Sequence, residues 1–263
     1  MKTALIVSTY NWPEALRISL GNVRIQTILP TFVIVADDGS TEDTRKMIEQ
    51  MSKDFPVPLH HVWQEDKGFR VARVRNLAMA KAVELGAEYI IQIDGDILMG
   101  RHFIEDHISE AQRGVFYCGA RAYISPQKTA RLLAKGKPAK LSFLSSGIRH
   151  RFNALRIPFF TRFTRCKRRY IGCNMAFWLA DAKDINGYDE EFVGWGAEDD
   201  DFCIRMKRLG CNLQRIKFKA IAFHLAHPDH TRHENHVLLH EKHAQNEYHY
   251  CKTGLDGHLS KKD

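Results

Sequence analysis

Three groups of acidic residues have the type and spacing needed for chemistry on a phosphorylated ligand. Asp37 and Asp38 follow one short apolar run, Asp94 and Asp96 follow another, and residues 198–201 are four acids in succession. Two carboxylates separated by a glycine at the end of a strand can hold a hard divalent cation that in turn binds a diphosphate. The pair at 94 and 96 is therefore the first candidate for a metal-assisted site.

The acidic run at 198–201 opens a predicted helix and comes directly after the sequence Gly194-Trp195-Gly196-Ala197. Acids stabilise a helix N-terminus through its dipole, but four adjacent carboxylates repel one another more than capping requires. The glycines allow close approach of the backbone to a ligand, and an indole offers a flat apolar face to a sugar ring. This pattern indicates a binding or catalytic site.

The elements that position these acids follow a βαβ pattern. Short apolar runs at residues 3–8, 32–36, 59–63 and 89–93 alternate with helical patterns, of which the helix over about 70–85 is the longest. This alternation predicts an α/β fold with a mostly parallel sheet. Ligands bind such sheets beyond the carboxyl ends of the strands, where the first two acidic groups are expected.

The second half of the sequence is less regular. It predicts strands over 115–124 and 170–179, a helix over about 198–209, further strands to about residue 224, and a helix over about 232–250. The stretch between the first two of these strands reads as an insertion. We detect no internal repeat and no low-complexity linker.

The net charge of +8 is distributed unevenly, because residues 121–170 contain fourteen Lys and Arg and no Asp or Glu. Subtracting +14 from +8 leaves −6 for the rest of the chain. Apolar residues alternate with the charges over 155–163, which suits an anionic, partly apolar partner such as an anionic membrane or a lipid-linked substrate. A solvated basic loop and nucleic-acid binding are the alternatives, and the acidic remainder argues against nucleic acid.

Two further features bear on location. No window approaches the roughly 20 apolar residues that cross a bilayer, so membrane contact is expected to be peripheral. The six cysteines show no Cys-x-x-Cys spacing. Reduced thiols in the cytoplasm are the simplest interpretation, with the protein placed at the inner face of the cell membrane.

Taken in order, these motifs resemble glycosyltransferase family 2, the inverting nucleotide-sugar transferases of GT-A fold. The resemblance covers residues 3 to about 227 without the basic insertion and is strongest to members with a β-1,4-galactosyltransferase-like C-terminal half, such as bacterial capsular chondroitin polymerase. It implies an open, mostly parallel, twisted Rossmann-like sheet flanked by helices, with a C-terminal helix. The matching segments are residues 7–11, 37–40, 75–76, 94–96 and 195–201.

The resemblance also assigns a donor site. It implies that Thr9 and Asp38 contact the uridine of a UDP-sugar, with Asp37 beside them. Arg75 and Asp94 are expected near the same donor. Arg70 and Arg73 are alternatives to Arg75.

A metal site and a catalytic base follow from the same resemblance. Asp96 and His224 are expected to bind Mn²⁺ or Mg²⁺, with His227 in reserve for His224. Asp199 corresponds to the catalytic base of an inverting reaction, which needs only one base. The expected acceptor-binding residues are Trp195, Glu198 and Asp200.

We therefore expect one GT-A domain over 1–263. Residues 1–113 form its nucleotide-sugar-binding half, 114–227 its acceptor and catalytic half with the insertion at about 125–169, and 228–263 a helical tail. The expected activity is transfer of a hexose from a UDP-sugar to a hydroxyl of a surface glycan, such as a lipopolysaccharide core or a capsule precursor. A non-catalytic nucleotide-sugar or glycan binding protein is the alternative, which the combination of base, acid pair and histidine disfavours.

Overall fold

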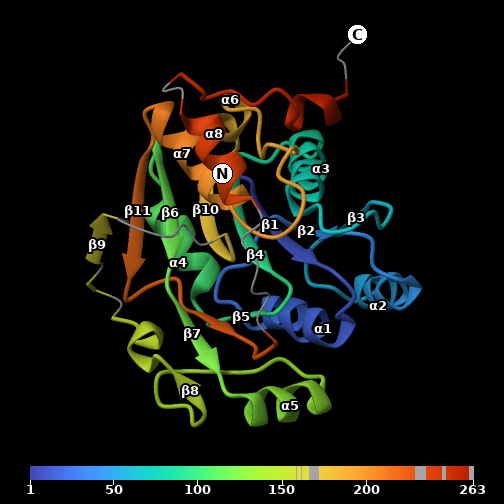
Figure 1. The fold of residues 1–263 in the computed structure, drawn as a ribbon. Coiled ribbons are helices and arrows are strands. Elements are labelled where there is room, and N and C mark those ends of the chain that lie inside the picture. Colours follow the sequence, from blue (N-terminus) through green and yellow to red (C-terminus); the bar gives the residue numbers. More distant parts are fainter. Residues whose placement is uncertain (158, 161, 166–171, 229–234, 245–246, 261–263) are drawn as a thin grey trace.

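The computed structural model describes residues 1–157, 159–160, 162–165, 172–228, 235–244 and 247–260, and it contains two sheets. The larger sheet has eight strands in the order β3-β2-β1-β4-β10-β6-β11-β9 (Figure 1). Its strands are β1 Thr3–Thr9, β2 Phe32–Asp37, β3 Leu59–Trp63, β4 Tyr89–Asp94, β6 Val115–Gly119, β9 Arg162–Arg165, β10 Asn174–Trp178 and β11 Asn212–Lys217.

The predicted parallel arrangement is confirmed for the first half of the chain. Strands β1 to β4 pair in parallel, and a helical connection precedes each of β2, β3 and β4. Strand β10 runs antiparallel between β4 and β6, and β9 is an antiparallel edge strand beside β11. The sheet is thus mostly parallel, as expected for an α/β fold.

Helices cover both faces of this sheet, which explains why its central strands are apolar on both sides. Helices α3, α6 and α7 pack on one face, and α1, α2 and α4 pack on the other. In β1 the side chains of Ala4 and Ile6 join the first core, and those of Leu5 and Val7 join the second. The helices are α1 Pro13–Gly21, α2 Glu42–Ser52, α3 Val71–Glu84, α4 Phe103–Glu110, α6 Leu179–Asp184 and α7 Glu198–Arg208.

A second, four-stranded sheet was not predicted from the sequence. Its order is β5-β12-β7-β8, and it packs on the outer side of α1 around a third apolar core. It lies at the end of the molecule away from α8 (Figure 1). Its elements are β5 Ile97–Met99, β7 Arg121–Ile124, β8 Ile148–Arg149 and β12 Ala222–His224, with α5 Pro126–Lys135 and the 3-10 turns Asn22–Ile25 and Arg151–Ala154 nearby.

Two segments of the chain cross from the large sheet to the small one. The predicted single strand over 115–124 is wrong, because the chain leaves the large sheet after β6 and enters the small sheet as β7. Strands β11 and β12 make the same passage beside it. At this crossover the amide of Asn174 donates to the carbonyls of Ala120 and Ala220, at 3.1 and 3.0 Å. The Asn174 side chain thereby hydrogen-bonds two carbonyls that have no strand partner where the hydrogen-bonding pattern of the sheets is interrupted.

The basic segment at residues 121–170, which was predicted as an insertion, forms part of both sheets. It supplies β7 and β8 to the small sheet and the edge strand β9 to the large one. The predicted tail helix over 232–250 is too long: α8 spans His236–His243, and no helix is present over 247–254. Among the described residues, none of the helices has the length and apolar character needed to cross a bilayer.

Candidate active site

The acid pair Asp94 and Asp96, at the end of β4, lies where the sequence predicted, at the carboxyl end of the parallel strands. Gly95 allows this loop to touch β1, since a Cβ at Gly95 would lie 3.1 Å from the Ser8 carbonyl oxygen and 3.2 Å from Thr9 Oγ1. The Gly95 N–H donates to that same carbonyl at 2.7 Å. The ends of β1 and β4 are thus held together, with Thr9 beside the acid pair.

Asp96 lies beside both histidines that the sequence analysis considered. Its Oδ2 is 3.5 Å from His224 Nε2 and 3.3 Å from His227 Nε2. Each of these residues offers one ligand atom within 4.8 Å of the others. Asp96 Oδ1 is buried and has no hydrogen-bond partner within the described part of the chain. A buried carboxylate oxygen facing two imidazole nitrogens is a donor set that fits a divalent cation.

Both imidazoles are oriented for this use. Nδ1 of His224 lies 2.8 Å from the Leu225 carbonyl, and Nδ1 of His227 lies 2.7 Å from the Pro228 carbonyl. These contacts leave the Nε2 atoms to face Asp96, as is common for metal-binding histidines. Burial lowers the pKa of His224 to about 4, so its ring is neutral at physiological pH, which is the form that binds metals.

The two acids after β2 are buried and hold their own loop together. Asp37 accepts from the Ser40 N–H at 2.8 Å and lies 2.9 Å from His61 Nε2. Asp38 accepts from the Arg70 N–H at 2.8 Å and from the Gln64 amide. Burial raises the pKa of Asp38. These bonds join the end of β2 to the loop before α3, beside the end of β1.

Arg75 stands at the centre of the site. Its side chain is only 3% exposed, and its guanidinium lies 2.9 Å from Asp199, 3.2 Å from Glu198 and 3.3 Å from Asp94. It also stacks over Tyr188, with 5.2 Å between the guanidinium carbon and the ring centroid. One cation on α3 therefore joins the acids at the end of β4 to those at the start of α7.

The start of α7 requires an unusual backbone. Ala197 has a φ of +71°, a conformation that is uncommon for residues other than glycine and is often found at functional sites. Asn235 donates to the Gly196 carbonyl at 3.0 Å and so secures the loop that carries Trp195, which is partly exposed. The strained loop aims the first acids of α7 at Arg75.

The four successive acids have different environments. Burial raises the pKa of Glu198 to about 8, and its Oε2 has no hydrogen-bond partner among the described residues. Asp199 is partly exposed and accepts from the Gly172 N–H and from Tyr188 Oη, the latter at 3.3 Å. Burial raises the pKa of Asp199 as well, while Arg75 opposes the shift. Asp200 is partly exposed at the same end of the helix.

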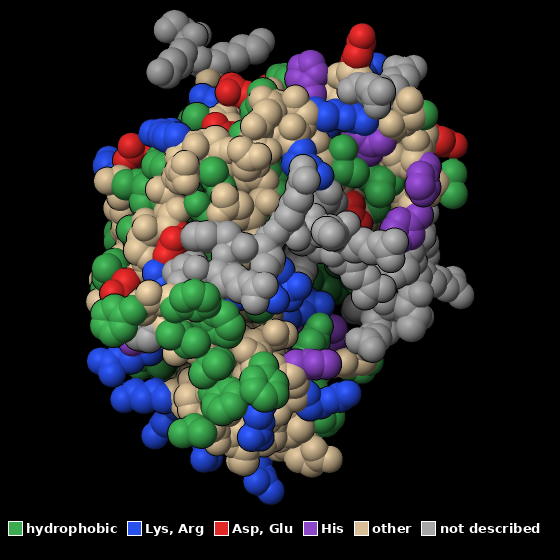
Figure 2. All heavy atoms as spheres, turned by 90° about the vertical axis from the view of Figure 1, so that its left-hand side faces the viewer, with side chains coloured by type: hydrophobic (Ala, Val, Ile, Leu, Met, Phe, Trp, Pro, Cys, Tyr) green, Lys and Arg blue, Asp and Glu red, His purple; other side chains and the backbone are tan. Residues whose placement is uncertain are grey.

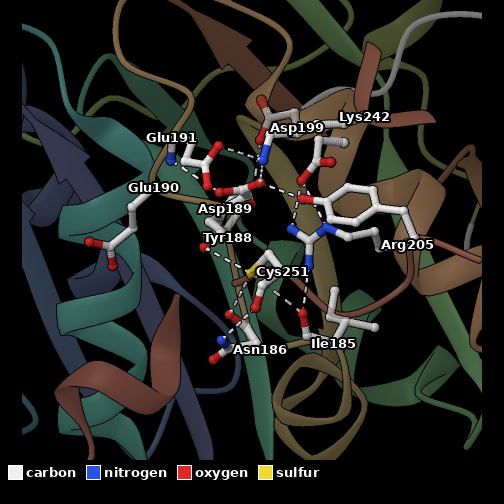
Figure 3. A network of polar contacts seen from close by, with 12 residues as sticks. Ile185, Asn186, Tyr188, Asp189, Glu190, Glu191, Asp199, Arg205, Lys242 and Cys251 are labelled. Atoms are coloured by element: carbon white, nitrogen blue, oxygen red, sulfur yellow. Dashed lines mark hydrogen bonds and ion pairs between the residues drawn. The ribbon is translucent and has the colours of Figure 1, made fainter. Parts of the chain in front are cut away.

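Asp201 differs from its neighbours because it is fully buried and structural. It binds Arg205 one turn later at 2.6 Å, and its other oxygen lies 3.0 Å from His243 Nε2 of α8. Arg205 also donates to the Ile185 carbonyl (Figure 3). The spacing of Asp201 and Arg205 indicates a helical ion pair from sequence, but the contact with His243 depends on the folded tail.

A second ion pair fastens the same tail. Lys242 lies 2.6 Å from Asp189 and 2.9 Å from Glu191, which precede α7 in the chain (Figure 3). No sequence motif predicts a role for these residues, or for Tyr188 and Gly172. Asn186-Gly187 before Tyr188 is a turn signal, but nothing local indicates that the tyrosine reaches Asp199.

The structure therefore brings together most of the predicted site. Arg75 links Asp94 to Glu198 and Asp199, and Asp96 lies with His224 and His227. Thr9, Asp37 and Asp38 lie at the ends of the neighbouring strands β1 and β2. The carboxyl edge of the large sheet thus carries an acid and histidine cluster beside a buried arginine with three carboxylates.

This architecture is that of GT-A glycosyltransferases. GalNAc-T7, in a crystal structure with UDP, GalNAc and Mn²⁺, superposes with a TM-score of 0.67 at 12% identity, covering 92% of this chain and 48% of that one. The 1–349 segment of S. aureus TarS, in complex with UDP-GlcNAc, superposes with a TM-score of 0.59 at 18% identity, covering 87% of this chain and 60% of that one.

Sequence comparison identifies the family. The profile of glycosyl transferase family 2 matches residues 4–172, and the profile described as the N-terminal domain of galactosyltransferase matches residues 160–234. The chain belongs to glycosyl transferase family 2. This agrees with the resemblance drawn from the motifs.

Individual relatives are 28% identical to this chain over the aligned residues. Validoxylamine A glucosyltransferase of Streptomyces hygroscopicus subsp. limoneus is 28% identical over 222 residues, which cover 79% of this chain and 48% of the relative. Chondroitin synthase of Escherichia coli is 28% identical over 249 residues, which cover 86% of this chain and 35% of the relative. The chain thus spans about half or less of the length of these relatives.

Proposed function

We propose that this protein is an inverting, metal-dependent glycosyltransferase that moves a hexose from a UDP-sugar to a hydroxyl of a glycan. The observation that carries the proposal is the contact of Arg75 with both Asp199 and Asp94. Through this contact the candidate base Asp199 lies beside Asp94, and Asp96, two residues further on, lies with His224 and His227. Membership of family 2 and the likeness to structures that contain UDP or UDP-GlcNAc support the choice of donor.

In the proposed reaction Asp199 removes the proton from the acceptor hydroxyl as its oxygen attacks the anomeric carbon. The bond from that carbon to the diphosphate oxygen breaks, the electron pair leaves with UDP, and the configuration inverts. Asp199 must be ionised for this step, and its ion pair with Arg75 favours the ionised form. The bonds from Gly172 and Tyr188 hold the carboxylate in place.

Asp96, His224 and His227 would hold Mn²⁺ or Mg²⁺. When bound, the cation supplies positive charge that stabilises the departing diphosphate. In the donor half, Thr9 and Asp38, with Asp37 beside them, would face the uridine. On the acceptor side, Trp195 would stack on a sugar ring, and Glu198 and Asp200 would bind its hydroxyls.

Successive parts of the chain would have different roles. Residues 1–113 would bind the sugar nucleotide, 114–227 would bind the acceptor and carry the base, and 228–263 would act as a clamp on α7. The large sheet is continuous across the first boundary, which supports the proposal of one domain made of both halves. We place the enzyme at the cytoplasmic face of the cell membrane, with an anionic or lipid-linked acceptor such as a lipopolysaccharide core or a capsule precursor.

The test is release of UDP by the purified protein from UDP-glucose, UDP-galactose and their N-acetyl forms, with GDP-mannose as comparison, with and without Mn²⁺. We expect one UDP-sugar to react only with Mn²⁺, and we expect Asp199→Asn to lower the rate about 10²-fold or more while donor binding persists. Asp43→Asn, in the exposed first turn of α2, is the matched control.

Two results would contradict the proposal. If UDP-sugars bind but none is cleaved or transferred with a panel of glycan acceptors, the protein is a binding protein on this scaffold. If none binds even with Mn²⁺, the donor site is assigned wrongly.

A further inference from the structure

The segment between β7 and β9 exposes several large apolar side chains on one face of the molecule. The exposed fractions are 83% for Leu144, 76% for Phe152, 101% for Phe159 and 52% for Phe160. Figure 2 shows hydrophobic side chains gathered on the lower part of this face, with Lys and Arg side chains around and below them. A contiguous apolar patch of this kind marks a surface that binds a partner.

These aromatic side chains are not needed to fill the core beneath them. The small core beneath them already contains Ala139, Ile148 and Ala154 of the same segment, and the partly buried Leu132, Leu133 and Leu141 pack against it. At the surface Phe152 packs against the half-buried Phe143, with 5.7 Å between ring centroids, and Phe160 packs against Phe218, with 5.8 Å between ring centroids. The segment therefore holds its aromatic side chains outward on a packed base.

The segment that carries these rings has charges of one sign. Residues 121–157 contain no Asp or Glu. The guanidinium of Arg151 lies 6.0 Å from the ring centroid of Phe143, so cation and aromatic ring are adjacent. The exposed basic residues of the segment are Arg131, Lys135, Lys137, Lys140, Arg149 and Arg151. Aromatic side chains among cations match the interface of an anionic bilayer, where rings enter the headgroup region and cations meet lipid phosphates.

The same segment is attached directly to the metal-binding loop. Tyr123 of β7 lies between His150 and His224, with ring centroids 5.7 and 5.6 Å away. Thr129 of α5 accepts a hydrogen bond from the Ala226 N–H at 2.9 Å. The apolar and basic surface of this segment therefore has a fixed position relative to the active site.

We propose that the face formed by Phe143, Leu144, Phe152, Phe159 and Phe160, with the surrounding Lys and Arg, is a membrane-docking surface that inserts its aromatic side chains into an anionic phospholipid bilayer. This inference extends the proposed function and depends on it in one respect, namely that a docked enzyme meets lipid-linked acceptors. Five further Lys and Arg at 162–169 belong to the same sequence segment, but their side chains lie outside the described residues.

The test is co-sedimentation of the full chain with vesicles of phosphatidylcholine alone or with phosphatidylglycerol, without sugar nucleotide. We expect binding to the anionic vesicles only, and a loss of about tenfold or more in Phe152→Ser/Phe159→Ser/Phe160→Ser. Ile28→Ser/Val237→Ser removes exposed apolar side chains elsewhere and should bind like the parent protein.

A second pair of variants separates charge from insertion. Lys135→Gln/Lys137→Gln/Lys140→Gln should weaken binding, whereas Lys46→Gln/Lys53→Gln/Lys252→Gln, which removes the same charge from other exposed positions, should not. A thermal unfolding curve for each variant confirms that it is folded. If the triple serine variant does not fold, Phe159→Trp replaces it, and its added fluorescence should be quenched by brominated lipid.

Three outcomes would overturn the proposal. One is equal vesicle binding by the folded serine variant and the parent protein, which would show that attraction to the charged headgroups alone accounts for the binding. Another is no binding to anionic vesicles by the parent protein. The third is a dimer in sedimentation equilibrium that the serine variant abolishes, which would assign the face to a second copy of the chain. Because no donor is present, none of these outcomes depends on the transferase activity.

Discussion

Replacing Arg75 by Met should destabilise the protein strongly and in a pH-dependent way. The buried guanidinium contacts Asp94, Glu198 and Asp199 at 3.3, 3.2 and 2.9 Å, and the last two have pKa values raised by burial. Removal of one partner from a buried ion pair costs about 3–5 kcal/mol, because the remaining charge is left uncompensated. We expect a loss of about 4 kcal/mol in the free energy of unfolding at pH 8.

The sign of the pH dependence follows from linkage. Without Arg75 the pKa values of these carboxyls in the folded state rise further above their unfolded values of about 4. A carboxyl whose folded pKa is raised favours folding below its unfolded pKa, and this contribution is lost as pH rises through the folded pKa. The difference between parent and variant should therefore widen from pH 5 to pH 8.

The assay is urea unfolding at pH 5, 6.5 and 8, followed by circular dichroism. Arg45→Met is the matched control, since Arg45 pairs with Glu42 and Glu49 on the exposed surface of α2 and its loss should have little effect. Adding Glu198→Gln to the Arg75 variant should restore part of the stability at pH 8. A loss below about 1 kcal/mol at pH 8, or one that is the same at pH 5, would refute this account of the site.

Three further predictions separate structural from chemical roles. Asp201→Asn should lower the free energy of unfolding by about 3 kcal/mol in urea titrations, because Arg205 loses its buried partner, and an unchanged midpoint would contradict this. Gly172→Ala should lower kcat at least about tenfold with the donor KM unchanged, since the added Cβ would lie 2.1 Å from Asp199 Oδ2; normal turnover would show that Asp199 is not held there during the reaction. Asp96→Asn should weaken Mn²⁺ binding about 10- to 100-fold in calorimetry, and equal affinity would place the cation elsewhere.

The parallel half of the fold was predictable because its strands are buried on both faces. Continuous apolar runs, such as residues 32–36, end at polar residues just where the strands end. The candidate site was predictable for the same reason, since its acids directly follow strands or open a helix. Both histidines that the sequence offers as metal ligands, His224 and His227, lie beside Asp96.

The small sheet could not be predicted, because the sequence hides the point where the chain changes sheets. Residues 115–124 are apolar apart from Arg121, with Gly119 and Ala120 before it, and none of these three residues alone indicates a change of sheet. The break is stabilised by Asn174, which is 54 residues away in the sequence. Likewise, the role of Asp201 depends on His243, 42 residues later. Local patterns carry no information about such distant partners.

The passage of the chain between the two sheets has a consequence for how this protein can be varied. Asn174 fills the space at Gly119 so closely that a Cβ there would lie 2.1 Å from its amide nitrogen, and its Oδ1 lies 2.9 Å from His107 Nε2. Residues at this junction are therefore tightly constrained. The chain after Ile124 meets the rest of the protein through a different set of contacts, among them the Ala139 N–H with Asn22 Oδ1 at 2.9 Å and Arg156 with Asp106 at 2.6 Å, and these partners would have to be matched in an exchange. Chimaeras between related enzymes should accordingly exchange the segment between Ile124 and β9 as a cassette and leave the junction intact. Acceptor choice and membrane attachment could then diversify by recombination while the donor chemistry stays the same.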